Sequence, residues 1–296
     1  MNDQDGKKLL IIFNPTAGRR QVSKFQAIVA KLKANGLSLD IVETKSEGHA
    51  TRAARDNVTS HYDMIVAAGG DGTINEVING LCPYKIPLAI IPLGTVNVLA
   101  LEIKLKTDIN SIVKYLMDGI VKECWLGKIN DHYYSLMLSV GHDAKSVQNV
   151  SKTLKKYFGR AAYIISYLAS VIKNGNTLYK VTIDNKVYQA SNVIVCNGKL
   201  YGGHYICAPD ASLSDETMFV LLAKKKGRLS ALKYAFLMVM QKYPFSRSIE
   251  IIETRSLYIE SNEMCEPIQT DGDSYGTLPG KVSISDESLN LLYPIG

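Results

Sequence analysis

Short apolar runs and amphipathic segments alternate along the first half of this 296-residue chain, and no other feature constrains the fold as strongly. Residues 9–13 form a continuous apolar run that ends at Asn14-Pro15, which is typical of a buried strand leading into a loop. Residues 24–35 then carry apolar side chains on one helical face. Further strands are expected at residues 37–42, 64–68 and 88–91, with helices at 49–57, 73–81 and 107–118. The pattern predicts an α/β fold with a parallel sheet flanked by helices.

The second half of the chain is rich in strands instead. Two helices, at residues 152–173 and 229–243, interrupt strand-like pieces at residues 133–140, 179–183, 193–196, 218–222, 256–260 and 282–284. We therefore expect an α/β domain over residues 1–127 and a mainly antiparallel, β-rich domain over residues 128–296. The last apolar piece, about residues 288–296, is expected to be a strand that returns to the first domain.

Composition and charge narrow the class of protein. Hydrophobic residues make up 46% of the chain and charged residues 21%, which excludes a disordered, collagenous or coiled-coil protein. Lysine and arginine number 34 against 28 acidic residues, so the net charge is +6. This mild excess favours anionic partners such as phospholipid surfaces or nucleotides, but it identifies none of them.

Cysteine usage and the amino terminus indicate the compartment. The five cysteines form an odd set without a Cys-x-x-Cys pair, so we interpret them as reduced core thiols. Residues 1–8 lack the basic start and apolar stretch of a secretory signal, and no run of about 18 apolar residues offers a membrane span. The sequence therefore predicts a cytoplasmic protein whose membrane contact is peripheral.

The segment Gly69-Gly70-Asp71-Gly72-Thr73 lies where a buried strand gives way to a helix. Glycines let the backbone approach a ligand closely, and the amides at the start of the helix form a concave site for phosphate. Asp71 can then help to hold a Mg²⁺ that bridges the phosphates, and the Thr73 hydroxyl can donate to a phosphate oxygen. A tight turn in which Asp71 or Thr73 merely caps the helix fits the same loop. The spacing is neither that of a P-loop nor that of a dinucleotide fingerprint.

With Asn75-Glu76 after it, this loop resembles the nucleotide motif of the diacylglycerol kinase catalytic-domain family, which includes YegS-type bacterial lipid kinases and sphingosine kinases. Further segments resemble the family's motifs in the same order: Asn14-Pro15 with Gly18, Thr44 before Gly48-His49-Ala50, Pro92-Leu93-Gly94-Thr95-Val96-Asn97, Gly141-His142-Asp143-Ala144, Pro209 with Asp215, and Asp271-Gly272-Asp273. The match spans nearly the whole chain, and its order makes it more specific than any single motif. The resemblance implies an α/β nucleotide-binding domain followed by a β-rich domain for the lipid substrate.

The resemblance also implies which residues contact ATP. This set is Asn14, Thr44, Gly69, Gly70, Asp71, Gly72, Thr73, Asn75 and Thr95. Asn14 and Thr95 follow expected parallel strands, and open α/β sheets bind ligands at the carboxyl ends of their strands, so these groups should converge. Taken alone, Thr44 also fits a solvated loop residue, and Asn14 fits an Asx-type cap that only shapes its turn.

Asp271-Gly272-Asp273 has two interpretations. Asp-Gly is a strong signal for a type I′ hairpin turn. The family carries Asp-Gly-Glu here, and the resemblance implies that its last carboxylate, Asp273 in this chain, takes the proton from the lipid hydroxyl that attacks the γ-phosphate. A base must lie within about 2.6–3.2 Å of its proton or one water away, so the shorter side chain of Asp273 needs a shifted backbone or a bridging water. A loss of activity is the other outcome.

A loop at residues 211–217 resembles the structural Mg²⁺ site of the family. The resemblance implies that Asp215 supplies a carboxylate and that the main-chain carbonyls of Ser212 and Thr217 complete the shell. Glu216 stands where the family has glycine, which either alters the turn or adds a ligand. A plain acidic surface loop fits this segment as well.

Two segments are candidates for contact with an anionic membrane surface. Residues 152–173 mix lysines and Arg160 with apolar side chains, and Lys224-Lys225-Lys226 with Arg228 precede an apolar stretch at residues 235–240. Basic, apolar helices of this kind can lie in a membrane interface. More often, however, such helices bury their apolar side in the core and expose their lysines.

Together, the residues and the resemblance predict an ATP- and Mg²⁺-dependent lipid kinase that transfers the γ-phosphoryl group to a hydroxyl of diacylglycerol or a related lipid. An NAD kinase-like enzyme is one alternative, because that family also uses a Gly-Gly-Asp-Gly loop. A nucleotide- or lipid-binding regulator, in which the altered Asp273 has ended turnover, is another. The expected partners are ATP, a lipid acceptor and an anionic membrane surface, with no nucleic acid. The sequence does not determine whether the protein forms a homodimer.

Overall fold

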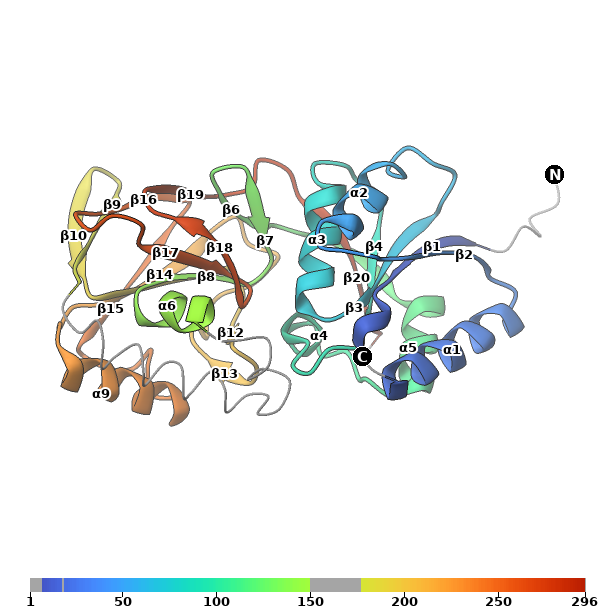
Figure 1. The fold of residues 1–296 in the computed structure, drawn as a ribbon, viewed down its shortest axis with the longest axis horizontal. Coiled ribbons are helices and arrows are strands. Elements are labelled where there is room, and N and C mark those ends of the chain that lie inside the picture. Colours follow the sequence, from blue (N-terminus) through green and yellow to red (C-terminus); the bar gives the residue numbers. More distant parts are fainter. Residues whose placement is uncertain (1–6, 18, 150–176, 296) are drawn as a thin grey trace. The chain divides into compact units, whose positions relative to one another are not determined.

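The computed structural model describes residues 7–17, 19–149 and 177–295. The chain divides into two compact units (Figure 1): unit 1 contains Met1–Trp125 and Asp286–Gly296, and unit 2 contains Leu126–Ser285. Two parts of the sequence prediction, Gly18 and the helix expected at residues 152–173, lie outside the described residues. Within the described ranges, no helix combines the length and the apolar character that crossing a bilayer requires.

Unit 1 is a six-stranded sheet with helices on both faces. Its strands lie in the order β2-β1-β3-β4-β20-β5, and all neighbours are parallel except β20 and β5. Helix α1 packs beside α5, and α2 packs beside α3, on the other face of the sheet in Figure 1. The strands are β1 (Lys8–Phe13), β2 (Ser38–Glu43), β3 (Met64–Gly69), β4 (Leu88–Pro92), β5 (Ile120–Cys124) and β20 (Leu289–Tyr293). The helices are a 3-10 turn (Pro15–Ala17), α1 (Arg19–Ala34), α2 (His49–Arg55), α3 (Asp71–Leu81), α4 (Val98–Glu102) and α5 (Ile109–Asp118).

The burial of the strands follows from these helical layers. The inner strands β1, β3 and β4 are apolar, apart from Lys8 at the start of β1, because helices cover both of their faces. The edge strands β2 and β5 carry Asp40, Lys122 and Glu123, and such charges discourage pairing with a further strand. The predicted α/β class with a mostly parallel sheet is therefore confirmed. Helix α1 begins five residues earlier than expected. The prediction missed its first turn because that turn is polar and lacks the apolar periodicity on which the prediction depended.

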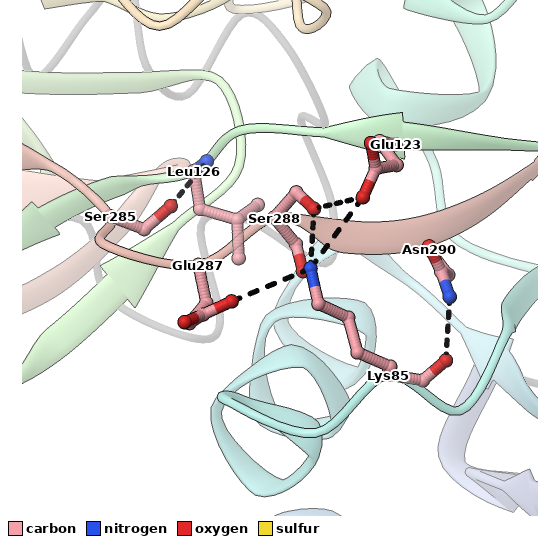
Figure 2. A network of polar contacts seen from close by, with 7 residues as sticks. All are labelled: Lys85, Glu123, Leu126, Ser285, Glu287, Ser288 and Asn290. Atoms are coloured by element: carbon pink, nitrogen blue, oxygen red, sulfur yellow. Dashed lines mark hydrogen bonds and ion pairs between the residues drawn. The ribbon is translucent and has the colours of Figure 1, made fainter.

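The carboxyl-terminal strand β20 lies between β4 and β5 of unit 1, although it follows unit 2 along the chain. Figure 2 shows how Lys85 holds the start of this strand. Its ammonium group donates to the carbonyl and hydroxyl oxygens of Ser288 at 3.0 and 2.6 Å, and it lies 3.7 Å from Glu123 and 3.6 Å from Glu287. The side chain of Asn290 donates to the Lys85 carbonyl at 2.6 Å. Because the ion pairs are exposed, they orient the strand more than they stabilise it.

Unit 2 consists mainly of two antiparallel sheets. Their strand orders are β10-β9-β16-β19-β6-β7 and β15-β14-β11-β8-β17-β18, with β12 and β13 paired separately. The strands are β6 (Gly127–Ile129), β7 (His132–Tyr134), β8 (Met137–Val140), β9 (Tyr179–Ile183), β10 (Lys186–Ala190), β11 (Asn192–Cys196), β12 (Leu200–Tyr201), β13 (Tyr205–Ile206), β14 (Met218–Ala223), β15 (Ile249–Thr254), β16 (Ser256–Ser261), β17 (Pro267–Thr270), β18 (Asp273–Thr277) and β19 (Gly280–Ile284). The helices are α6 (His142–Asn149) and α9 (Arg228–Val239). This architecture confirms the predicted antiparallel β class.

The second sheet of unit 2 is covered on both faces. Toward the first sheet, a Cβ placed on Gly280 of β19 would lie 3.6 Å from Ile268 of β17. On the opposite face lies α9, in a buried cluster that includes Ile194, Cys196, Leu221, Ala223 and Tyr234. Successive residues of a strand point to opposite faces, so β11 and β14 need apolar side chains on both, and every residue of these strands is apolar except Asn192 at the start of β11.

Residues 133–140, expected as one strand, form two. Strand β7 belongs to the first sheet of unit 2 and β8 to the second, and the chain changes sheet at Ser135 and Leu136. Both corner residues are buried, so the run of buried positions continues through the corner. The prediction of a single strand is wrong because nothing in the local pattern marks the break.

Candidate active site

The carboxyl ends of β2, β1, β3 and β4 lie next to one another at one edge of the sheet in unit 1. The chain passes from β1 to β2 on one side and from β3 to β4 on the other, so the connections diverge between β1 and β3. In open α/β sheets, ligands bind outside such a switch point. Asn14, Thr44, the loop at residues 69–73 and Thr95 follow these four strands, so the sheet brings the predicted nucleotide residues to one edge.

Asn14 and Thr73 meet at the switch point. The Asn14 amide donates to the Ala68 carbonyl at 2.9 Å, and its Nδ2 donates to Thr73 Oγ1 at 3.0 Å. Asn14 Oδ1 accepts from the amide and the hydroxyl of Thr16 at 3.0 and 2.7 Å. The side chain thus shapes its own Asx-type turn and also ties that turn to α3. Because Thr73 acts as the acceptor here, its hydroxyl hydrogen can still donate to a ligand.

Helix α3 begins at a glycine. Its N-cap residue is Gly70 in an extended conformation, and this residue has no side chain of its own with which to cap the helix. The first turn consists of Asp71, Gly72 and Thr73, whose amides have no acceptor within the helix. The helix dipole adds positive charge at the same place. Neither Asp71 nor Thr73 is therefore the N-cap of this helix, and the first turn presents amides suited to an anion.

The Asp71 carboxylate caps a different helix. Its Oδ2 accepts from the Asn97 amide at 3.0 Å, and its Oδ1 accepts from the Val98 amide at 2.7 Å, at the start of α4. These bonds fix the carboxylate between the two glycine turns. Each carboxylate oxygen has a further lone pair, so capping α4 is compatible with holding Mg²⁺, which prefers oxygen ligands.

The two glycine turns touch backbone to backbone. The Leu93 amide donates to the Gly69 carbonyl at 2.8 Å. A Cβ on Gly94 would lie 2.7 Å from the Gly70 Cα and 2.7 Å from Asn97 Oδ1, closer than Cβ atoms approach other atoms in proteins. Gly94 is therefore needed for the contact itself, independently of any ligand.

Thr95 and Thr44, the two remaining predicted nucleotide residues that follow strands, lie on the flanking loops. Thr95 is exposed, next to a turn in which Asn97 accepts from the Gly94 amide at 2.8 Å and donates to its carbonyl at 2.9 Å. Thr44 is half-buried, and its amide donates to the Phe13 carbonyl at 2.8 Å. The backbone bond of Thr44 and the turn closed by Asn97 place the two threonines at the carboxyl edge of the sheet.

Glu76 has a structural role that the sequence analysis missed. Its carboxylate accepts from the Gly48 and Ala50 amides, both at 3.0 Å, and so caps α2. Its neighbour Asn75 accepts from Asn79 Nδ2 at 3.1 Å along α3. Glu76 therefore holds the loop after β2 against α3. The only signal in the sequence was its place in the glycine-loop motif.

Lys24 is a cation that the sequence analysis missed at this edge. Its ammonium group donates at 3.3 Å to the carbonyl of Pro92, the last residue of β4. Burial lowers the pKa of the Lys24 ammonium group below its usual value. A lysine on an amphipathic helix usually lies with its stem on apolar surface and its head in water, so the sequence held no specific signal for this placement.

In unit 2, Asp271 and Gly272 form the hairpin turn between β17 and β18. Their φ angles are 48° and 89°, and a type I′ turn needs positive φ at both central residues. Thr270 and Asp273 are paired on either side of the turn. The predicted hairpin is confirmed, and Asp273 lies exposed at the start of β18.

The Asp271 carboxylate stabilises the corner between the two sheets of unit 2. It accepts from the amide and hydroxyl of Ser135 at 2.6 and 2.9 Å, and from the amides of Leu136 and Met137 at 2.9 and 3.1 Å. Amides at such a buried corner need acceptors. Asp271 therefore anchors the hairpin that carries Asp273.

Hydrogen bonds continue from this turn into the interior of unit 2. The Gly272 amide donates to Gln269 Oε1 at 2.8 Å, and Gln269 Nε2 donates to Ser139 Oγ at 3.0 Å. The Tyr201 hydroxyl lies 3.4 Å from Ser139 Oγ and donates to Asp143 Oδ2 at 2.7 Å. Burial raises the pKa of the Asp143 carboxyl group. The Gly-His-Asp-Ala motif is thus connected to the hairpin turn, which its place in the sequence did not indicate.

The loop predicted to hold a structural Mg²⁺ is a turn at the surface of unit 2. The Asp215 amide donates to the Ser212 carbonyl at 3.0 Å, the Asp215 side chain is exposed, and Thr217 is half-buried. Glu216 forms an ion pair with Arg255 at 2.7 Å, which directs its charge to that partner. A carbonyl oxygen has two lone pairs, so the oxygen donors of Ser212 and Asp215 remain compatible with a Mg²⁺ shell. Among the described residues, no group of three or more His, Cys, Asp or Glu side chains is arranged to hold a metal.

Comparisons with known proteins cover both units. The model of the diacylglycerol kinase catalytic domain matches residues 8–129, and that of the YegS C-terminal NAD kinase beta sandwich-like domain matches residues 137–293. A diacylglycerol kinase of Bacillus subtilis is 28% identical over 281 residues, which cover 93% of this chain and 92% of the relative. A diacylglycerol kinase of Staphylococcus haemolyticus is 30% identical over 276 residues, which cover 91% of this chain and 83% of the relative.

A solved structure agrees with these matches. A putative diacylglycerol kinase from Bacillus anthracis str. Sterne has a TM-score of 0.79 and 27% sequence identity, and the likeness covers 99% of this chain and 97% of that one. The resemblance found in the sequence motifs is therefore confirmed over nearly the whole length. The chain belongs to the diacylglycerol kinase catalytic-domain family and carries that family's YegS-type carboxyl-terminal domain.

Proposed function

We propose that this protein is an ATP- and Mg²⁺-dependent lipid kinase that transfers the γ-phosphoryl group of ATP to a hydroxyl of diacylglycerol or a closely related lipid. Family membership supports the reaction class, because the relatives are named diacylglycerol kinase. One observation carries the proposal: the start of α3, whose N-cap residue is Gly70, lies at the switch point of the sheet, with the second glycine turn directly against it. A cytoplasmic enzyme at the membrane surface fits this reaction.

The nucleotide is assigned to the carboxyl edge of unit 1. The first-turn amides of α3 and the Thr73 hydroxyl would bind phosphate oxygens, while Asn14 keeps Thr73 in place. Asp71, oriented by its two bonds to α4, would hold Mg²⁺, which neutralises charge on the phosphates when it is bound. Thr44 and Thr95 would bracket the nucleotide from the flanking loops.

Asp273 is assigned the role of general base. Its carboxylate is exposed, and the turn before it is held by the Asp271 bonds and by the bond from Gly272 to Gln269. Asp273 would accept the proton of the lipid hydroxyl as that oxygen attacks the γ-phosphorus in line and ADP leaves. A bridging water would compensate for the side chain that is one methylene shorter than glutamate.

A phosphorylation assay tests the proposal on the full chain. It uses γ-labelled ATP with Mg²⁺ and offers diacylglycerol, phosphatidylglycerol, a sphingoid base or NAD as the acceptor. The variants are Asp273→Ala, Asp273→Glu and the control Asp131→Ala, which alters another exposed aspartate of unit 2. We expect a lipid to be phosphorylated, with a loss of about 10²–10⁴-fold in Asp273→Ala, retention in Asp273→Glu and no change in the control.

The other outcomes separate the alternatives. Phosphorylation of NAD and of no lipid would favour the NAD kinase-like enzyme. If calorimetry shows that ATP binds while no acceptor is phosphorylated, the protein is a regulator and not a kinase. Equal lipid kinase activity in wild type and Asp273→Ala would remove Asp273 as the base.

A further inference from the structure

Helix α9 of unit 2 exposes an apolar stripe. Leu229 is 85% exposed, Phe236 64% and Val239 53%, and Leu232 and Met240 are exposed as well. Steps of three and four residues place these side chains on one side of the helix. The stripe extends along the whole of α9. Figure 1 draws this helix in orange. Contiguous apolar patches on proteins in water commonly mark interaction sites.

The opposite side of α9 is packed in the core. Ala231 and Tyr234 are buried, and Leu237 packs against the cluster beneath the helix. The Tyr234 hydroxyl accepts from the Lys225 amide at 3.0 Å, and its ring meets that of Tyr243 edge-on with centroids 6.1 Å apart. The helix is therefore fixed to the second sheet of unit 2. It is apolar on both sides, although the core needs only one of them.

Exposed basic residues flank the stripe along the chain. Residues 217–249 contain no aspartate or glutamate, and their basic residues, all of them exposed, are Lys224, Lys225, Lys226, Arg228, Lys233, Lys242 and Arg247. Of these, Lys224 forms an ion pair with Glu250 at 2.8 Å. A bilayer that contains anionic phospholipids complements this pattern, because its headgroups pair with cations while its acyl boundary accepts apolar side chains.

The same charges disfavour a second copy of the chain as the occupant. In a symmetric pair, the α9 face of one molecule would meet the identical face of the other, so basic residues would approach one another without acidic partners. We propose that the α9 face, meaning the apolar stripe with its basic rim, docks this protein on an anionic phospholipid bilayer. The proposal deepens the proposed function and rests on it in one respect: a kinase of bilayer-resident lipids has to work at that surface.

The test is co-sedimentation of the full chain with vesicles, without nucleotide and without diacylglycerol. Vesicles of phosphatidylcholine alone are compared with vesicles that also contain phosphatidylglycerol. Leu229→Gln/Phe236→Gln removes apolar exposure from the stripe, and Lys225→Gln/Lys226→Gln removes charge from the rim. Val187→Gln, at a 58% exposed position of β10, and Lys186→Gln are matched controls in the same unit. Thermal unfolding of each variant verifies that it is folded.

We expect wild type to bind the anionic vesicles and to release them as salt is raised. The stripe variant should bind at least about ten-fold more weakly than wild type. The rim variant should also bind more weakly, and its binding should depend less on salt. Both controls should bind as wild type does. Equal binding by the stripe variant and wild type would overturn the proposal, as would equal binding to both kinds of vesicle. A dimer in ultracentrifugation that the stripe variant dissociates would assign the face to a second copy instead. Because no phosphoryl transfer is measured, failure here is distinguishable from failure of the kinase assay.

Discussion

Asp71 and Asp271 both use their carboxylates to accept hydrogen bonds from backbone amides. Asp71 accepts from two amides at the start of α4, and Asp271 accepts from three amides and a hydroxyl at the sheet corner. In both places the carboxylate satisfies backbone donors that would otherwise lack partners. Asp273, two residues after Asp271, is exposed, and it is the residue proposed to meet the substrate.

Replacing Asp271 by asparagine should destabilise unit 2. Oδ1 and Oδ2 of Asp271 each accept two hydrogen bonds, and an asparagine would turn an NH₂ group toward two of those donors. We expect Asp271→Asn to lower the free energy of unfolding by about 2–3 kcal/mol. The exposed control Asp273→Asn should change it by less than about 0.5 kcal/mol. Denaturant unfolding measures both, and equal stability of the two variants would contradict the role assigned to Asp271.

At the scale of elements, the helix starts differ in where their caps come from. Asp108 caps α5 locally by accepting from the Ser111 amide at 3.0 Å. The caps of α2 and α4 come from Glu76 and Asp71 instead, which are 26 residues or more away along the chain. Helix α3 begins at Gly70, an N-cap residue without a side chain, and it follows β3 at the switch point of the sheet. Its first-turn amides are the ones proposed to bind phosphate.

The contact between the two glycine turns can be tested by adding one methyl group. A Cβ at position 94 would lie 2.7 Å from the Gly70 Cα, so Gly94→Ala must push the second turn away from the start of α3. We expect binding of Mg-ATP, measured by calorimetry, to weaken about ten-fold or more. In the control Gly276→Ala, the added methyl group meets no atom within 4 Å, and nucleotide binding should be unchanged. If Gly94→Ala is folded by circular dichroism and binds as wild type does, the turns do not form the phosphate site.

At the scale of the whole molecule, the chain leaves unit 1 after Trp125 and returns to it at Asp286. The returning strand β20 fills the position between β4 and β5, with Leu289, Leu291 and Leu292 almost fully buried. The sheet of unit 1 is complete only when the chain has been synthesised through β20. Unit 1 therefore depends on residues that the sequence places after unit 2.

Removal of residues 286–296 should prevent unit 1 from folding, because β4 and β5 would lose the strand between them. The truncated protein should be insoluble or bind a dye for apolar surface. Leu291→Ala is the milder test and should cost about 2–5 kcal/mol in the free energy of unfolding. Deletion of residues 294–296, which follow the strand, is the control and should leave solubility and unfolding unchanged. A soluble, cooperatively unfolding 1–285 fragment would contradict this dependence.

The sequence by itself determined the alternation of buried strands and helices in unit 1 and the strand-rich character of unit 2, because apolar periodicity is a local record of which faces are buried. It also carried the family, because the order of motifs is a property of the chain alone. Only the tertiary structure decided that Asp71 caps α4, that residues 133–140 divide between two sheets, and that one apolar side of α9 is exposed. Each of these depends on which distant segments meet, and a local pattern of side chains does not name its partner.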